Sequence, residues 1–194
     1  MDVIDTLVSI GAGSTLDAVR ARRPEARAQA QRSHEVLFAP EEPRGVSLVE
    51  RHAVGLFVAL LQDADGLAAL HVRGLSAADA APGLRDAVEA AAASGLAPGP
   101  YGSYPAGPLS REDAEGPSWR PAGAAAAVLG LRLTAALEHA HMLVLHPRDA
   151  SPEALRALEG AGWRADDIVT LSQLVAFTTF QLRVIAGLRV LDKA

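Results

Sequence analysis

Alanine and leucine dominate this chain. Of its 194 residues, 40 are Ala and 26 are Leu, about a third of the total. Both residues are strong helix formers, whereas the alternating β-branched and aromatic runs that mark strands are missing. Aromatic residues make up only 4% of the chain. We therefore predict an all-α fold in which small and aliphatic side chains let the helices approach closely.

Charge and cysteine content exclude several classes of function. The chain has 18 basic and 23 acidic residues, whereas a nucleic-acid partner needs a basic face. No apolar run reaches the roughly 18 residues of a membrane span, and the first fifteen residues are unlike a secretory signal. We expect a cytoplasmic protein with no nucleic-acid or membrane partner. The absence of cysteine removes disulfides, thiolate metal sites and thiol catalysis.

Helix starts are marked by hydroxyl residues with a carboxylate three positions later. This capping-box pattern occurs at Ser14, Ser47 and Ser76. Gly11-Ala-Gly-Ser14 lacks both nucleotide-binding fingerprints and indicates a helix break followed by a cap. The helices that we expect cover residues 3–10, 14–22, 25–38, 47–62, 64–73, 77–94, 122–146, 152–159 and 165–191.

We expect one helical domain over residues 1–194, built from two related halves. The first half is 1–94 and the second is 124–194. The connector 95–123 holds 6 of the 12 Pro and 6 of the 17 Gly, together with Tyr101, Tyr104 and Trp119. Flexible linkers are poor in aromatics, so we expect the connector to pack against the helices, with its aromatics as anchors. A functional loop is the alternative.

The C-terminal part of the chain is similar to a known family. Segments 155–163, 166–177 and 183–189 resemble the closing helix-Gly-helix unit of the alkylhydroperoxidase AhpD-like and carboxymuconolactone decarboxylase (CMD) superfamily. Segments 47–51 and 52–71 resemble its first half. The layout is most similar to the two-segment, peroxidase-related CMD-domain proteins. This resemblance implies an AhpD-like helical bundle.

The motif of that family has an acid, two cysteines spaced C-x-x-C, and a histidine four residues after the second cysteine. With His71 placed at the histidine, the cysteine positions fall on Ala64 and Leu67, and the acid position falls on His52. The peroxidase chemistry of the family needs a thiolate nucleophile. The chain is therefore not expected to be a thiol peroxidase.

His71, His52 and Glu50 are the candidate catalytic residues. The resemblance implies that the two histidines lie on neighbouring helices and face one pocket, where a histidine can act as an acid or base near neutral pH. The alternative is a buried pair held only by hydrogen bonds. Glu50 is equally explained as the capping partner of Ser47. Arg51 is a candidate anchor for an anionic substrate, with an ion pair as the alternative.

Glu138-His-Ala-His141 has the Glu-x-x-His spacing of carboxylate-bridged di-iron bundles. Those sites need two such motifs and two more carboxylates, and the chain has one copy. We therefore expect no metal and no cofactor. A helical metalloprotein using Glu138 and the nearby histidines is kept as a third hypothesis.

Two functions fit better. The first is a cysteine-less AhpD/CMD-like pseudo-enzyme that works as an oligomeric binding or partner protein. The second is a thiol-independent, CMD-type decarboxylase or lyase, with histidine acid–base chemistry on a small carboxylated substrate. Whether the chain is an enzyme is left open. The closing helix 166–191 is too apolar for a free surface, so we also expect a homo-oligomer, most simply a twofold dimer.

Overall fold

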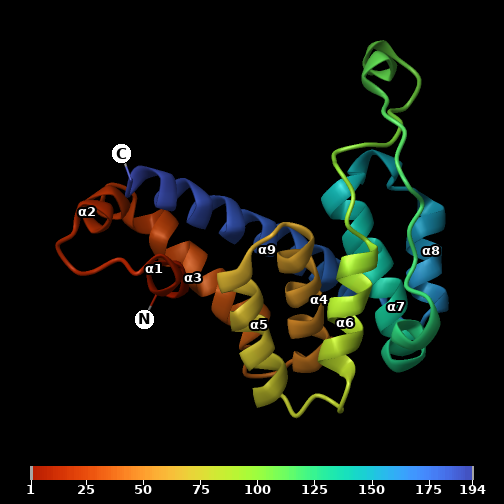
Figure 1. Ribbon diagram of the computed structural model, residues 1–194, viewed down its shortest axis with the longest axis horizontal. Coiled ribbons are helices and arrows are strands. Elements are labelled where there is room, and N and C mark those ends of the chain that lie inside the picture. The colour runs from red at the N-terminus through yellow and green to blue at the C-terminus, as the bar shows by residue number, and fades with distance from the viewer. Residues whose placement is uncertain (1, 194) are drawn as a thin grey trace.

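The computed structural model describes residues 2–193, and that part of the chain is all helical (Figure 1). Its one β feature is an isolated bridge between Gly102 and Ala114. The all-α prediction is therefore confirmed. The helices are α1 (Val3–Val8), α2 (Thr15–Ala21), α3 (Pro24–Phe38), α4 (Leu48–Leu61), α5 (Asp65–Ala77), α6 (Leu84–Ser94), α7 (Gly123–Leu145), α8 (Pro152–Gly160) and α9 (Ala165–Leu191). Two short 3₁₀ helices, Pro108–Glu112 and Pro147–Asp149, complete the order.

Helix α4 lies at the centre of the molecule. It packs against α5, α6, α7 and α9. Every residue from Ala53 to Ala59 is buried, because this stretch is apolar on all sides. A helix that is apolar all round is a core helix. In Figure 1, α4–α6 form the middle of the molecule, with α7 and α8 to one side and α1–α3 to the other.

Helix α9 connects two separate hydrophobic clusters. Its first half contributes Leu171 and Leu174 to the main core around α4. Its second half contributes Ile185 and Leu188 to a smaller cluster with residues of α1, α2 and α3. At 1.5 Å per residue, this 27-residue helix is about 40 Å long. It therefore joins the N-terminal helices to the body of the protein.

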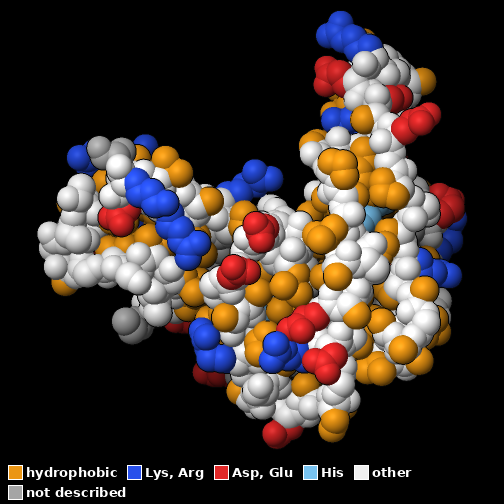
Figure 2. All heavy atoms as spheres, in the orientation of Figure 1, with side chains coloured by type: hydrophobic (Ala, Val, Ile, Leu, Met, Phe, Trp, Pro, Cys, Tyr) orange, Lys and Arg blue, Asp and Glu red, His pale blue; other side chains and the backbone are white. Residues whose placement is uncertain are grey.

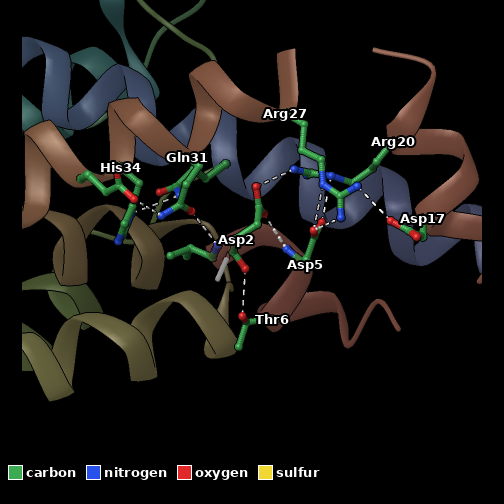
Figure 3. Close-up of polar contacts among 11 residues, drawn as sticks. Asp2, Asp5, Thr6, Asp17, Arg20, Arg27, Gln31 and His34 are labelled. Carbon is green, nitrogen blue, oxygen red and sulfur yellow. Dashed lines mark hydrogen bonds and ion pairs between the residues drawn. The ribbon is translucent and has the colours of Figure 1, made fainter. Parts of the chain in front are cut away.

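A network of ion pairs fastens the N-terminal helices to one another (Figure 3). Arg20 lies 2.9 Å from Asp2 and 2.9 Å from Asp5, while Arg27 pairs with Asp5 and with Asp17. The Nε of Arg20 and the Oδ1 of Asp5 are close but not aligned as a hydrogen bond, so that contact is an ion pair. Asp5 and Arg20 are both buried. Charge pairing thus supplements the small apolar cluster here.

The helix starts at Ser14 and Ser47 are as predicted. The hydroxyl of each accepts a hydrogen bond from the backbone amide three residues later, that of Asp17 or Glu50. The start predicted at Ser76 is wrong. Ser76 lies inside α5, where its hydroxyl donates to the carbonyl of Val72.

Two more boundaries differ from the prediction. The helix expected over 77–94 begins only at Leu84, after Gly83 with a φ of 81°. The helix expected over 122–146 is interrupted at Gly130, where φ is 68° and ψ is 174°. Both glycines adopt backbone angles that other residues rarely reach. The pattern of apolar residues continues across Gly130, so it conceals the break.

The connector is anchored at both roots, as expected. The Tyr101 ring stacks on His146 with centroids 4.8 Å apart. The Trp119 ring stacks on Phe57 at 5.2 Å and on His141 at 4.6 Å. Between these roots, residues 103–113 form an arm that projects from the helical body (Figure 1). The roots are packed as predicted, and the projecting arm contacts the body through Arg148, whose guanidinium lies 4.3 Å from the Tyr104 ring and donates to the carbonyl of Glu112.

By length and composition, α7 and α9 are apolar enough to cross a membrane. In α7, 50% of the most apolar 18-residue window is buried inside the molecule, and in α9 33% is buried. The core helices of soluble proteins pass the same test. More of the apolar surface of α9 is therefore uncovered in the single chain than that of α7.

Candidate functional site

His52 of α4 and His71 of α5 lie side by side. Their Nδ1 atoms are 3.3 Å apart, so one donates a hydrogen bond to the other. Only residues 62–64 separate the two helices in the sequence. The structure therefore brings together the two histidines that were expected to lie on neighbouring helices.

Each histidine lies over a glycine of the opposite helix. The ring of His71 covers Gly55 of α4, and the ring of His52 covers Gly74 of α5. A Cβ atom at either glycine would overlap the imidazole. The sequence repeats the same spacing, because Gly55 and Gly74 each follow a histidine by three residues. The pair is thus a reciprocal packing unit that joins α4 to α5.

Three further side chains from α3 and α9 enclose the pair. The Phe38 ring lies 4.6 Å from the His71 ring and 5.7 Å from the His52 ring, centroid to centroid. His34 lies 5.3 Å from Phe38 and contacts Gln181 of α9 at 3.3 Å. The cluster therefore joins α3, α4, α5 and α9.

All three histidines are held in the neutral form. Burial lowers the pKa of His71 well below its usual range, and the neighbouring His52 and His34 lower it further. Burial also lowers the pKa of His52, with His34 adding to it and the backbone of Phe38 opposing it. The pKa of His34 falls by burial, with Gln181 opposing the shift. A proton on this cluster would place an unpaired charge in the core.

His71 is closed to solvent, whereas His52 is only half-buried. His71 is 0% exposed, and its Nε2 has no hydrogen-bond partner among the described residues. None of the five best-formed cavities within residues 2–193 includes His52 or His71 in its lining. The pocket expected beside the histidines is replaced by the ring of Phe38. The thiol position Leu67 is buried as well.

Glu50 lies in a structural contact instead. One carboxylate oxygen accepts from the backbone amide of Ser47 at 2.8 Å and from its hydroxyl at 2.9 Å. The other accepts from Arg132 of α7 at 2.6 Å. The polar contacts of Glu50 within the described residues do not include His52 or His71. Glu50 thus caps α4 and ties it to α7.

Arg51 is buried and holds the loop before α4. Its guanidinium donates to the carbonyls of Leu37 at 2.7 Å, Pro43 at 2.9 Å and Val46 at 2.9 Å. Neither the expected substrate anchor nor the expected ion pair describes this role. Three carbonyls use the donors that an anion would need.

The residues of the proposed metal motif turn to different partners. Glu138 pairs with Arg120 at 2.7 Å, while Nε2 of His141 donates to the carbonyl of Gly95 at 3.0 Å. His139 contacts Ser172 at 3.0 Å. Within residues 2–193, no group of three or more potential ligands is placed to hold a metal ion. The metalloprotein hypothesis therefore has no ligand set in the described chain.

Sequence reasoning missed the outer part of the cluster. His34 and Gln181 are 147 residues apart, and neither belongs to the motif. The polar Gln181 within an apolar helix signals a buried polar contact, but nothing in the sequence names His34 as its partner. No family model, no curated protein and no solved structure matches this chain.

Proposed function

We propose that this chain is a cysteine-free relative of the AhpD-like/CMD superfamily that acts as a cytoplasmic, oligomeric binding protein rather than as a thiol peroxidase. The observation that carries the proposal is the His52–His71 contact. In the proposed alignment with the family motif, His52 and His71 are the two positions that hold polar side chains, whereas the two cysteine positions hold Ala64 and Leu67. The contact agrees with this register, although a hairpin of two helices joined by three residues also brings residues on its two arms together.

The burial of His71 and the packing of both rings against helix backbone support a structural role over catalysis. Acid–base catalysis requires that a substrate reach within hydrogen-bond distance of the group that moves the proton. His71 is sealed beneath Phe38, and both histidines are packed against helix backbone. The alternative of a thiol-independent decarboxylase or lyase would need this cluster to open. The same burial that holds α4 against α5 therefore works against turnover.

Hydroperoxide turnover tests the loss of the family chemistry. A thiol peroxidase converts a hydroperoxide and a dithiol into an alcohol, water and a disulfide. We expect the purified protein to show no rate above the protein-free reaction with an organic hydroperoxide and dithiothreitol. A reductant-dependent rate that is proportional to protein concentration would contradict the proposal.

Restoring the motif tests the resemblance itself. The triple variant Ala64→Cys, Leu67→Cys, His52→Glu places the acid and both thiols at the family positions. We expect this variant, unlike the native chain, to consume hydroperoxide. A matched control places the C-x-x-C spacing on an exposed part of α5 with Arg73→Cys and Ser76→Cys, in the same His52→Glu background.

Equal rates from the restored and control variants would contradict the proposed register, as would a restored variant that folds and stays inert. Far-ultraviolet circular dichroism establishes folding in each case. Carbon dioxide release from small lactone carboxylates tests the decarboxylase alternative. If the native chain releases carbon dioxide and the His52→Gln variant does not, the decarboxylase alternative is favoured over the binding protein.

A further inference from the structure

One face of α9 is uncovered in the single chain. Val169 and Phe180 are 58% and 46% exposed, and Gln173 and Ala176 are exposed between them. Their spacing of four, three and four residues keeps them on one narrow stripe of the helix. The anchored connector packs on α4, α7 and the segment after α7, and leaves this stripe open. A stripe that exposes Val169, Ala176 and Phe180 around one polar residue, Gln173, marks an interaction surface.

Two cavities of about 530 Å³ each flank the stripe. The first lies between α3 and α9, and the second lies between α8 and α9. Gln173 and Ala176 line both, so the cavities form one groove that crosses the stripe. The α8 side is the more apolar and includes Leu155, Ile168 and Val169. We call this surface the α9 groove.

We propose that the α9 groove binds the same surface of a second copy, with the two α9 helices antiparallel and Ala176 at the twofold axis. This inference deepens the proposed function, because it names the partner of the binding protein. The twofold axis crosses α9 at Ala176. A residue that precedes position 176 by a given number of residues therefore faces the partner's residue that follows position 176 by the same number. The contact is isologous, so every interaction occurs twice.

The register fits an exposed aromatic ring into a cavity. The partner's Phe180 falls at the level of Ser172, which lines the cavity between α8 and α9. Small residues recur at Ala165, Ala176 and Gly187, which are three helical turns apart. In the antiparallel register Ala176 meets the partner's Ala176, and Ala165 meets the partner's Gly187. Small side chains at these three levels let the helices approach closely.

Charge favours the antiparallel orientation. Arg183 and Glu159 are both exposed, and neither pairs with another charge within residues 2–193. Arg183 lies three turns beyond Ser172, on the same side of the stripe as α8. In the proposed register, the partner's Arg183 falls at the level of Val169, beside Glu159, which lines the same cavity. A parallel pairing would instead set like charges opposite each other.

The length of α9 suits a stable dimer. Such an interface buries about 800 Å² on each subunit, which is a patch about 28 Å across. The helix is about 40 Å long, and α3 and α8 widen the surface on both sides. The groove therefore offers enough area without a contribution from the arm.

Single-cysteine variants test the register, because the native chain has no cysteine that could interfere. We expect Ala176→Cys to form a disulfide-linked dimer on mild oxidation with diamide, since its two sulfurs meet at the axis. Gly187→Cys is the matched control, because it is exposed on the same stripe with open space around its Cβ position. Its two sulfurs would lie on the order of 33 Å apart and should not cross-link. Ala176→Cys that stays monomeric, or Gly187→Cys that cross-links as well, would overturn the register.

Exchanging the charges of Glu159 and Arg183 tests whether these two residues pair between two copies of the chain. We expect Glu159→Arg and Arg183→Glu each to weaken dimerisation about tenfold, and the double variant to restore it. Failure of the double variant to recover would contradict the pairing. Co-sedimentation of monomeric protein with phosphatidylcholine vesicles would assign the face to a membrane and overturn the proposal. These tests are separable from hydroperoxide turnover: a monomer without turnover refutes the dimer and the oligomeric part of the proposed function but leaves the loss of peroxidase chemistry standing, whereas a dimer with turnover refutes that loss and leaves the α9 contact standing.

Discussion

The ring of His71 covers Gly55 so closely that position 55 has no room for a Cβ atom. The reciprocal contact of His52 with Gly74 makes the same demand on α5. The histidine pair and the glycine pair are therefore one structural feature. This feature sets how closely α4 and α5 approach.

We expect Gly55→Ala to lower the free energy of unfolding by about 1–3 kcal/mol, because the added methyl overlaps a buried ring. Urea denaturation measures the change. The control Gly160→Ala adds the same methyl to the exposed last residue of α8, where a Cβ atom meets open space, and should raise stability by up to about 1 kcal/mol. Combining Gly55→Ala with His71→Ala tests the cause, because the smaller side chain removes the overlap. If Gly55→Ala proves neutral, the close contact between the helices is wrong.

Stability should depend on pH through the histidine cluster. Burial lowers the pKa of His34, His52 and His71 in the folded state, so the unfolded state binds more protons below about pH 6.5. The free energy of unfolding should therefore fall as the pH falls from 6.5, by up to about 1.4 kcal/mol per pH unit for each histidine. Urea denaturation at pH 7.5, 6.5 and 5.5 measures the slope.

Replacing His71 by Gln identifies the source of that slope. The variant keeps a polar side chain but cannot gain a proton, so its unfolding energy should fall less steeply below pH 6.5 than that of the native chain. An unchanged slope would place the pH dependence elsewhere in the protein.

The local features of this fold were predictable, and the long-range ones were not. The caps at Ser14 and Ser47 depend on a few neighbouring residues, so the sequence alone predicts them. That His52 and His71 lie on neighbouring helices was the expectation that the family resemblance implied, but their direct contact was not foreseen. The contact of His34 with Gln181 spans 147 residues, and no local pattern encodes it. Gly130 illustrates a different limit, because a single glycine interrupts a helix whose apolar pattern continues.

The arm and its roots should contribute unequally to stability. Gly102 and Ala114 pair through two backbone hydrogen bonds of 2.8 and 3.2 Å, so the base of the arm is closed. Replacing 103–113 with a two-residue turn should change the free energy of unfolding by less than about 1 kcal/mol. Trp119→Ala removes stacking on two rings and should cost about 2 kcal/mol. A large loss from the arm deletion would show that the exposed contacts of the arm with Arg148 and Asp149 contribute more to stability than exposed contacts usually do.

The ion network of the N-terminal helices should be sensitive to single changes. Asp5→Asn leaves Arg20 buried with less compensating charge. Removal of one partner of a buried ion pair costs about 3–5 kcal/mol, and we expect the free energy of unfolding to fall by that amount. Arg85→Ala breaks an exposed pair with Glu89 and should cost no more than about 0.5 kcal/mol. Thermal unfolding of both variants measures the contrast. Equal effects would show that the Asp5–Arg20 pair is solvated.

We expect this protein to work by self-association through α9. Multi-angle light scattering of the native chain at micromolar concentration tests it most directly, with Phe180→Glu as the variant that removes the aromatic ring from the groove. The account predicts twice the chain mass of 20.1 kDa for the native protein, and a single chain mass for a folded Phe180→Glu variant. A native mass that stays near 20.1 kDa as the concentration is raised would contradict it.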